Sequence, residues 1–148
     1  MTKPLPFTII IDTREKPAYR WLFDDDHPVK VKKLDTGDYS IEGCEHLICL
    51  ERKTLSDLIG SLFHDYERFK RELVRMKKIP NRYIVIEAVL RQADVHDYRS
   101  KVHPNSIVGR LLAIERDYGI HAIWATDSRT AQWVAGRIFK YFWKEHAK

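Results

Sequence analysis

Three residues in the first half of the chain have the types and the spacing of a metal-dependent hydrolytic site. Asp38 and Glu51 stand at the two ends of a predicted hairpin, and Lys53 follows Glu51 by two positions. Antiparallel pairing would bring the two carboxylates together, and Lys53 would point to the same side as Glu51 because side chains alternate along a strand. Hard divalent cations prefer such oxygen ligands, and a nearby lysine can orient or deprotonate water or stabilise developing charge. This pattern predicts phosphodiester hydrolysis that depends on Mg²⁺, with Mn²⁺ expected to substitute.

The same register gives Arg52 a different direction. Its side chain would point away from Glu51 and Lys53, while its main-chain carbonyl could face the metal ion. Taken alone, Asp38 could be an ordinary turn residue, since it follows Gly37. The combination with Glu51 and Lys53 across one hairpin favours the metal site.

Apolar periodicity predicts alternating strands and helices, and therefore an α/β fold around a mixed sheet. Strands are expected at residues 7–11, 29–34 (half-exposed), 38–41, 46–51, 83–86 and 121–125. Helices are expected at about 54–62, 66–78 and 127–143, with Thr54 or Ser56 capping the first and Asp127 or Ser128 the last. A further helix ending near Gly119 would carry the apolar residues Ile107, Leu111, Leu112 and Ile114.

Acids end three of the predicted strands. Asp12, Glu51 and Glu87 each follow a buried apolar run, and open α/β sheets usually carry their sites at the carboxyl ends of strands. For Glu87, a helix cap or a salt bridge is an equally good interpretation.

Composition indicates one globular domain over residues 1–148. The chain is 44% hydrophobic and 32% charged, it has no apolar run near the ~20 residues of a membrane span, and it opens without a secretory signal. The two cysteines, Cys44 and Cys49, are expected to be reduced and inert. We therefore expect no membrane association, and a cytoplasmic protein of bacterial, archaeal or phage origin, or a nuclear one if eukaryotic.

A basic segment follows the predicted site. The net charge of +5 favours an anionic partner, and residues 66–78 hold six of the cations. Arg68, Arg71 and Arg75 are the candidate phosphate contacts on this helix. The alternative is a solvated amphipathic face supported by pairs such as Glu67 with Arg71.

The last predicted helix carries an unusual number of aromatic residues. Trp133, Tyr141, Phe142 and Trp143 spread over a broad arc together with Ile138. Part of this arc should cover the sheet, and the rest predicts an interface between subunits.

Several of these segments resemble a known family. Gly37-Asp38 followed by Glu51-Arg52-Lys53 and then Asp57 resembles the signature of the XPF-type structure-specific nucleases, within the PD-(D/E)XK restriction-endonuclease-like group. Ile10-Ile11-Asp12-Thr13-Arg14-Glu15 is similar to that family's opening motif, a strand ending in Asp-x-Arg-Glu. Asp57-Leu58-Ile59-Gly60-Ser61-Leu62 continues the match, and Arg68 stands where the family carries a basic residue. The match is close from Phe7 to about Glu87.

The resemblance implies a single nuclease domain with a restriction-endonuclease-like mixed β-sheet flanked by α-helices. It implies that Asp38 and Glu51 bind the metal, that Asp12 and Glu15 lie near it, and that Lys53 is catalytic. Residues expected to contact the metal or to orient its ligands are Arg14, Arg52 and Asp57. The alternatives without a site role are that Asp12 and Glu15 are loop acids paired with Arg14, and that Asp57 only caps or places a favourable negative charge in the first turn of its helix.

The resulting prediction is an endonuclease that cuts DNA at branched or flapped structures, acting as a homodimer through the C-terminal helix. One alternative is a non-catalytic DNA-binding or scaffolding partner, although such a subunit would be expected to lose Asp38, Glu51 or Lys53. Another is a junction-resolving or restriction-type endonuclease on the same fold. Members of the family usually add a tandem helix-hairpin-helix domain, which these residues lack, so DNA affinity must come from the nuclease domain or from a partner protein.

Overall fold

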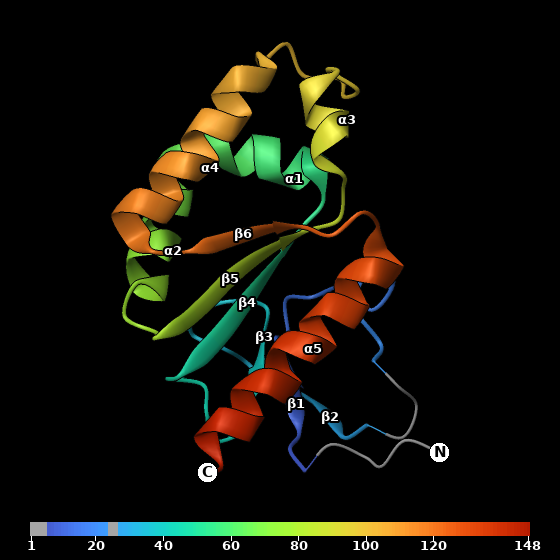
Figure 1. Cartoon of the computed structure of the whole chain (residues 1–148), viewed down its shortest axis with the longest axis vertical. Coiled ribbons are helices and arrows are strands. Elements are labelled where there is room, and N and C mark those ends of the chain that lie inside the picture. Colours follow the sequence, from blue (N-terminus) through green and yellow to red (C-terminus); the bar gives the residue numbers. More distant parts are fainter. Residues whose placement is uncertain (1–5, 24–26) are drawn as a thin grey trace.

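The centre of the protein is a six-stranded mixed sheet. The computed structural model describes residues 6–23 and 27–148, and its strands lie in the order β2-β1-β3-β4-β5-β6 (Figure 1). Their bounds are β1 Ile9–Ile11, β2 Val29–Val31, β3 Tyr39–Ile41, β4 Ile48–Lys53, β5 Asn81–Ile86 and β6 His121–Trp124. The predicted mixed sheet is confirmed.

Among the described strands, only β3 is antiparallel to both of its neighbours. It pairs antiparallel with β1 and β4, while β1 pairs parallel with β2, β4 with β5, and β5 with β6. The carboxyl ends of β1, β4 and β5 therefore meet the amino end of β3 at one edge of the sheet. Asp12, Asp38, Glu51 and Glu87 all come from that edge.

Helices cover both faces of the sheet. In the described part of the chain, the helical segments from α1 to α4 lie on one side, and the long helix α5 lies diagonally across the other (Figure 1). The bounds are α1 Leu55–Ile59, η1 Gly60–His64, α2 Tyr66–Met76, α3 Leu90–Asp94, α4 Pro104–Tyr118 and α5 Ser128–His146. In the described part of the chain, no helix has the length and apolar character needed to cross a membrane.

Two hydrophobic cores fill the spaces between sheet and helices. Leu58, Leu62 and Leu73 pack with Cys49 of β4 on the α1–α4 side, whereas Ile48 and Leu50 belong to the core under α5. Because side chains alternate along β4, Glu51 and Lys53 must leave on the α1–α4 side and Arg52 on the α5 side. The packing of the two cores thus determines on which face of the sheet each candidate site residue lies.

The predicted helix at 54–62 is present but changes character in its middle. Thr54 caps α1 by accepting a hydrogen bond from the N–H of Asp57 at 3.1 Å, and the chain then widens into the π-helix η1. Periodicity could not show this, because the apolar residues keep a helical spacing through both parts. Asp127 caps α5 in the same manner, accepting from Thr130 at 2.7 Å.

One sequence interpretation needs correction. The strand at 29–34 is not half-exposed: all of β2 is exposed, because it stands at one end of the sheet. The predicted helix that ends near Gly119 is confirmed as α4, on which Ile107 and Ile114 are buried and Leu112 is 62% exposed. The short helix α3 was not predicted, because a five-residue helix gives too little periodicity to detect.

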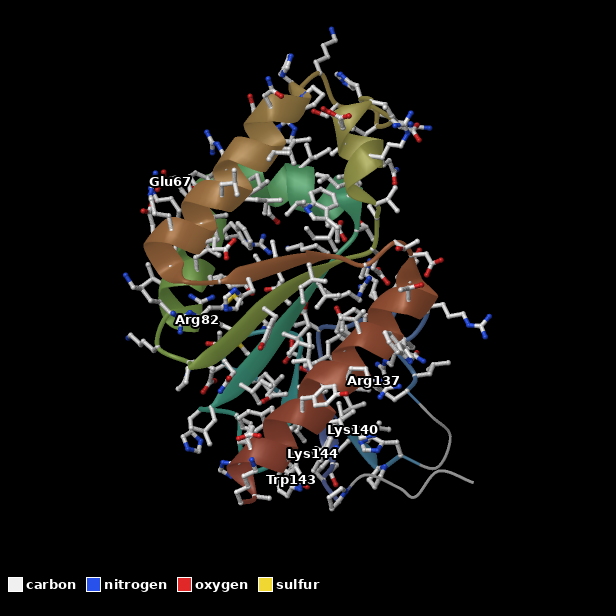
Figure 2. The ribbon with its side chains drawn as sticks, viewed as in Figure 1. Glu67, Arg82, Arg137, Lys140, Trp143 and Lys144 are labelled. Atoms are coloured by element: carbon white, nitrogen blue, oxygen red, sulfur yellow. The ribbon has the colours of Figure 1, made fainter. Side chains whose placement is uncertain are left out.

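Helix α5 buries a narrower face than its composition suggests. Ala131, Ala135 and Phe139 are buried in the core, while Trp133 and Tyr141 are exposed on the outer side. Figure 2 shows Arg137, Lys140, Trp143 and Lys144 following one another along this helix. The exposed aromatic residues alternate with cations, so Arg137 lies over the Trp133 ring at 4.8 Å.

Candidate active site

The amino end of β3 is held tightly against β4, and this places Asp38. The N–H of Asp38 donates to the carbonyl of Leu50 at 2.8 Å, and its Oδ2 accepts from the N–H of Arg52 at 2.8 Å. Gly37 makes the approach possible: its φ is +80°, and a Cβ there would lie only 3.1 Å from the Cβ of Cys49. Position 37 therefore favours glycine for two reasons, the positive φ of the backbone and the lack of space for a Cβ.

The carboxyl group of Glu51 is buried beside Asp38. Only 4% of Glu51 is exposed, and no donor among the described residues reaches its Oε2. Burial, followed by the charge of Asp38, raises the pKa of Glu51 well above its usual value, and burial also raises the pKa of Asp38. The repulsion between two carboxylates this close is relieved when they share a proton or bind a cation.

A third carboxyl group joins this pair from the helical layer. Glu72 of α2 lies within hydrogen-bonding reach of Glu51, and its negative charge adds to the rise in the pKa of that residue. Glu72 is not among the site residues that the sequence motifs indicate. A signal was present: Glu72 follows Phe69 by three positions, and residues three apart share a helix face. Phe69 is buried, so Glu72 is turned toward the sheet as well.

Lys53 is held on the same side of β4. Its Nζ donates to Oγ of Ser61 at 2.9 Å and lies 5.1 Å from the centre of the Phe69 ring. Ser61 belongs to the π-helix η1, which Arg110 of α4 braces by donating to the carbonyl of Leu62 at 2.6 Å. Short π-helical segments are frequent at functional sites, and here one positions the partner of the lysine.

Asp12 lies at the same edge, with both oxygens occupied. Oδ1 accepts from the N–H of Leu34 at 2.7 Å and Oδ2 from Nε of Arg14 at 2.6 Å, and Asp12 is fully buried. Arg14 itself is largely exposed, and its pKa is raised by the bond to Asp12, with smaller contributions from Asp38 and Glu72. Arg14 is therefore a cation at the mouth of the carboxylate cluster, and Asp12 anchors it.

The side chains of Arg52 and Glu15 lie on the other face of the sheet. The guanidinium of Arg52 bonds Oε2 of Glu15 at 2.7 Å and Oε1 of Glu87 at 2.8 Å. The predicted reversal of Arg52 relative to Glu51 is thus what the structure has. Of the group that the resemblance implied, Asp38, Glu51 and Lys53 come together on one face, while Arg52 and Glu15 back them from the opposite face.

Asp57 and the basic helix complete the surroundings. Asp57 is exposed in the first turn of α1, a position that suits a helix-capping charge and a site role equally. Arg68, Arg71 and Arg75 are all exposed on α2. Arg68 precedes Glu72 by four positions and Arg75 follows it by three, so these two cations flank the carboxylates on one helix face.

The donors at this edge suit a hard cation that keeps part of its water. Among the residues that the structure describes, no set of three His, Cys, Asp or Glu side chains is arranged as a ready metal cage. Asp38 and Glu51 nevertheless supply two adjacent carboxylates, one with an oxygen that lacks a donor. Mg²⁺ commonly binds through one or two carboxylates and several waters, so this set fits it.

Solved structures share this fold. XPF from Aeropyrum pernix superposes with a TM-score of 0.75 and 25% identity, covering 95% of this chain and 64% of that one. A structure of the same A. pernix protein in complex with DNA gives a TM-score of 0.73 and 25% identity over 94% and 66% of the two chains. The fold is therefore that of an XPF-type nuclease domain.

The family follows from a second comparison. The model of the ERCC4 domain matches residues 11–136, and this chain belongs to that family. A Methanocaldococcus jannaschii protein, described by its name as an ATP-dependent RNA helicase, is 28% identical over 143 residues. That match covers 97% of this chain but only 16% of the larger protein, so the chain corresponds to one segment of it.

Proposed function

We propose that this chain is a metal-dependent endonuclease that hydrolyses phosphodiester bonds in DNA. The observation that carries the proposal is the contact between Asp38 and Glu51 across β3 and β4, with a buried Glu51 oxygen that has no donor and with Lys53 on the same face. Asp38, Glu51 and the Arg52 carbonyl would hold Mg²⁺, for which Mn²⁺ would substitute. The cation would supply charge neutralisation and a more acidic water.

Lys53, Arg14 and Asp12 would have separate roles beside the metal ion. Lys53 leaves β4 on the same face as Glu51 and is held by Ser61, where it can orient the attacking water or stabilise charge on the phosphate. Arg14 stands exposed at the mouth, fixed by Asp12, and can contact the phosphate that enters. Asp12 has no oxygen left without a donor, so it would act through Arg14 rather than on the metal.

DNA would lie along α2. Arg68, Arg71 and Arg75 are exposed, and two of them flank the carboxylates, so phosphates bound there would lead the strand to the site. Such contacts position the substrate without reading its sequence. The A. pernix XPF was solved in complex with DNA. Branched or flapped DNA is the substrate that the family membership favours.

The protein would act as a homodimer through α5. A groove of about 1020 Å³ lies beside this helix, and its apolar lining includes Leu47, Tyr83, Ile138 and Phe142. Trp133 and Tyr141 also line it and are 61% and 59% exposed, and a contiguous exposed apolar patch of this kind marks an interaction site. A second copy could insert its own Trp133 there. A partner protein that adds DNA affinity would be the other occupant.

One cleavage experiment tests the function. Labelled duplex, flap, fork and four-way-junction DNAs of one sequence are incubated with Mg²⁺, Mn²⁺ or a chelator. We expect cutting of flaps or forks with either metal and none with chelator. Preference for four-way junctions or for a duplex sequence would favour the junction-resolving or restriction-type alternative. Binding of all DNAs without cleavage under any metal would favour the non-catalytic scaffold. The cellular compartment, cytoplasm or nucleus, follows from the DNA substrate in this proposal.

A further inference from the structure

A buried ionic triad lies directly behind the candidate active site. On the α5 side of β4, the Arg52 guanidinium sits between Glu15 and Glu87, at 2.7 Å and 2.8 Å, and each of the three side chains is at most 10% exposed. Two carboxylates share one cation here. Removing three charged groups from water is costly, and well-packed apolar residues often stabilise a fold at least as well. Stability alone is a weak reason for it.

Two aromatic residues close the triad into a ring. The hydroxyl of Tyr39 donates to Oε2 of Glu15 at 2.7 Å and accepts from the N–H of Trp21 at 2.8 Å. The indole Nε1 of Trp21 donates to Oε2 of Glu87 at 3.1 Å, and its ring stacks on that of Tyr39 with centroids 4.5 Å apart. Each acid therefore has an aromatic donor as well as the arginine.

Every strand-borne member of this ring is covalently or hydrogen-bonded to a site residue on the opposite face. Tyr39 follows Asp38, and Arg52 lies between Glu51 and Lys53. The N–H of Arg52 donates to Oδ2 of Asp38, and the N–H of Glu87 donates to the carbonyl of Lys53 at 2.8 Å. A shift of the triad would move the main chain that carries the carboxylates and the lysine.

We propose that Glu87 is a positioning residue: through Arg52, and together with Trp21 and Tyr39, it fixes the separation of Asp38, Glu51 and Lys53. The inference rests on the proposed function. Glu87 acts through Arg52, because its carboxyl group lies on the sheet face opposite Glu51 and is bonded to buried groups. The interpretation of Glu87 as a simple salt bridge or cap differs in its consequences, since it predicts a loss of stability only.

Glu87→Gln is the sharpest variant, because it keeps the size and the acceptor for Trp21 while removing the charge that holds Arg52. Tyr39→Phe tests the other end of the ring, and Glu42→Gln, at an exposed pair with Lys30, is the matched control. Mn²⁺ binding is measured directly by titration with detection of free Mn²⁺ by electron paramagnetic resonance. Single-turnover cleavage at several Mg²⁺ concentrations, DNA binding in the presence of Ca²⁺ and melting temperature are measured in parallel.

We expect Glu87→Gln to weaken Mn²⁺ binding by ~10-fold or more, the usual scale for groups that orient metal ligands, with DNA affinity unchanged. Tyr39→Phe should also weaken Mn²⁺ binding and slow cleavage, and Glu42→Gln should change neither. If Glu87→Gln lowers the melting temperature but leaves Mn²⁺ binding and cleavage as in the wild type, the inference about Glu87 is overturned and the proposed function stands. A wild type that binds Mn²⁺ without cutting refutes the proposed function, while the metal titration still decides the role of Glu87.

Discussion

At the scale of single residues, the candidate site is a place where like charges are crowded. Asp38, Glu51 and Glu72 converge at the edge of the sheet, and the rise in the pKa of Glu51 records that burial and its neighbours disfavour the ionised form. A divalent cation would relieve this repulsion. The chemistry and the electrostatic penalty therefore come from the same side chains.

Removing a single carboxylate charge tests the metal site. Asp38→Asn and Glu51→Gln should each abolish cleavage, because a ligand charge is lost while the shape is kept. DNA binding should persist or improve, since a group that repels phosphate has gone. The measurement is single-turnover cleavage in Mg²⁺ beside DNA affinity in Ca²⁺. Near-normal cutting by either variant would remove these residues from the site.

Lys53 is tested against its structural alternative. Lys53→Ala should lower the single-turnover rate by a factor of ~100 or more, the usual scale for a positioned electrostatic or acid–base group. Lys30→Ala is the control, because Lys30 makes an exposed pair with Glu42 at 3.2 Å. Such pairs contribute under ~1 kcal/mol, so the control should cut normally. Equal rates for the two variants would make Lys53 a structural residue.

At the scale of elements, the site depends on the close approach of β3 to β4. Gly37 and Gly43 both have positive φ, +80° and +85°, but only at Gly37 would a Cβ meet neighbouring atoms, including the Leu50 carbonyl at 3.2 Å. That carbonyl is the one that holds the N–H of Asp38. Substituting each glycine in turn therefore distinguishes the effect of backbone strain, present at both positions, from displacement of the site, expected only at Gly37.

Gly43→Ala should lower the free energy of unfolding by ~1 kcal/mol, the cost of the left-handed conformation, and leave cleavage unchanged. Gly37→Ala should cost more and should reduce the cleavage rate by ~10-fold or more, because small misplacements of reacting groups are expensive. Urea unfolding and single-turnover cleavage provide the two readouts. Equal effects of both substitutions on both readouts would show that the close approach has no functional role.

The sequence was most informative where contacts are local. The hairpin of β3 and β4 brings Asp38 and Glu51 together by strand pairing alone, and alternation along β4 sets the facing of Arg52 and Lys53, so both could be predicted. The spacing of Glu72 to Phe69 indicates only which face of α2 it shares. That Glu72 reaches Glu51 and Ser61 reaches Lys53 could not be predicted, because only the packing of α2 and η1 against the sheet brings them to the site. The ring around Arg52 could not be predicted for the same reason: its acids and aromatic donors come from three separate segments, the β1–β2 connection, β3 and the residue after β5.

At the scale of the whole molecule, the first question is how DNA is held. Arg68→Ala and Arg75→Ala should weaken binding to every DNA alike, and each should reduce the slope of log affinity against log salt by ~0.9 on duplex. Arg116→Ala, which breaks an exposed pair with Asp117 at 2.8 Å, is the control on α4. A loss confined to one DNA structure, or an unchanged slope, would contradict a phosphate track along α2.

The second question is assembly. Phe139 is fully buried in the core, so a charge there would unfold the protein and would not test an interface. Trp133→Glu and Tyr141→Glu are the informative substitutions, because both rings are exposed beside the α5 groove. We expect the wild type to sediment as a dimer and both variants as folded monomers with weaker DNA binding. A 17.6 kDa wild-type species at micromolar concentration that still cuts DNA would exclude a functional dimer.

Strand β2 bears on a different property, the tendency of the protein to aggregate. It stands at one end of the sheet, and Val29 and Val31 are 44% and 47% exposed. An open, apolar strand edge is a template on which other chains can add strands. Lys30, Lys32 and Lys33 interrupt and follow the valines, and their mutual repulsion between copies opposes such growth. Lysines with no part in the proposed chemistry would thus set how concentrated this protein can become before it forms fibrous deposits.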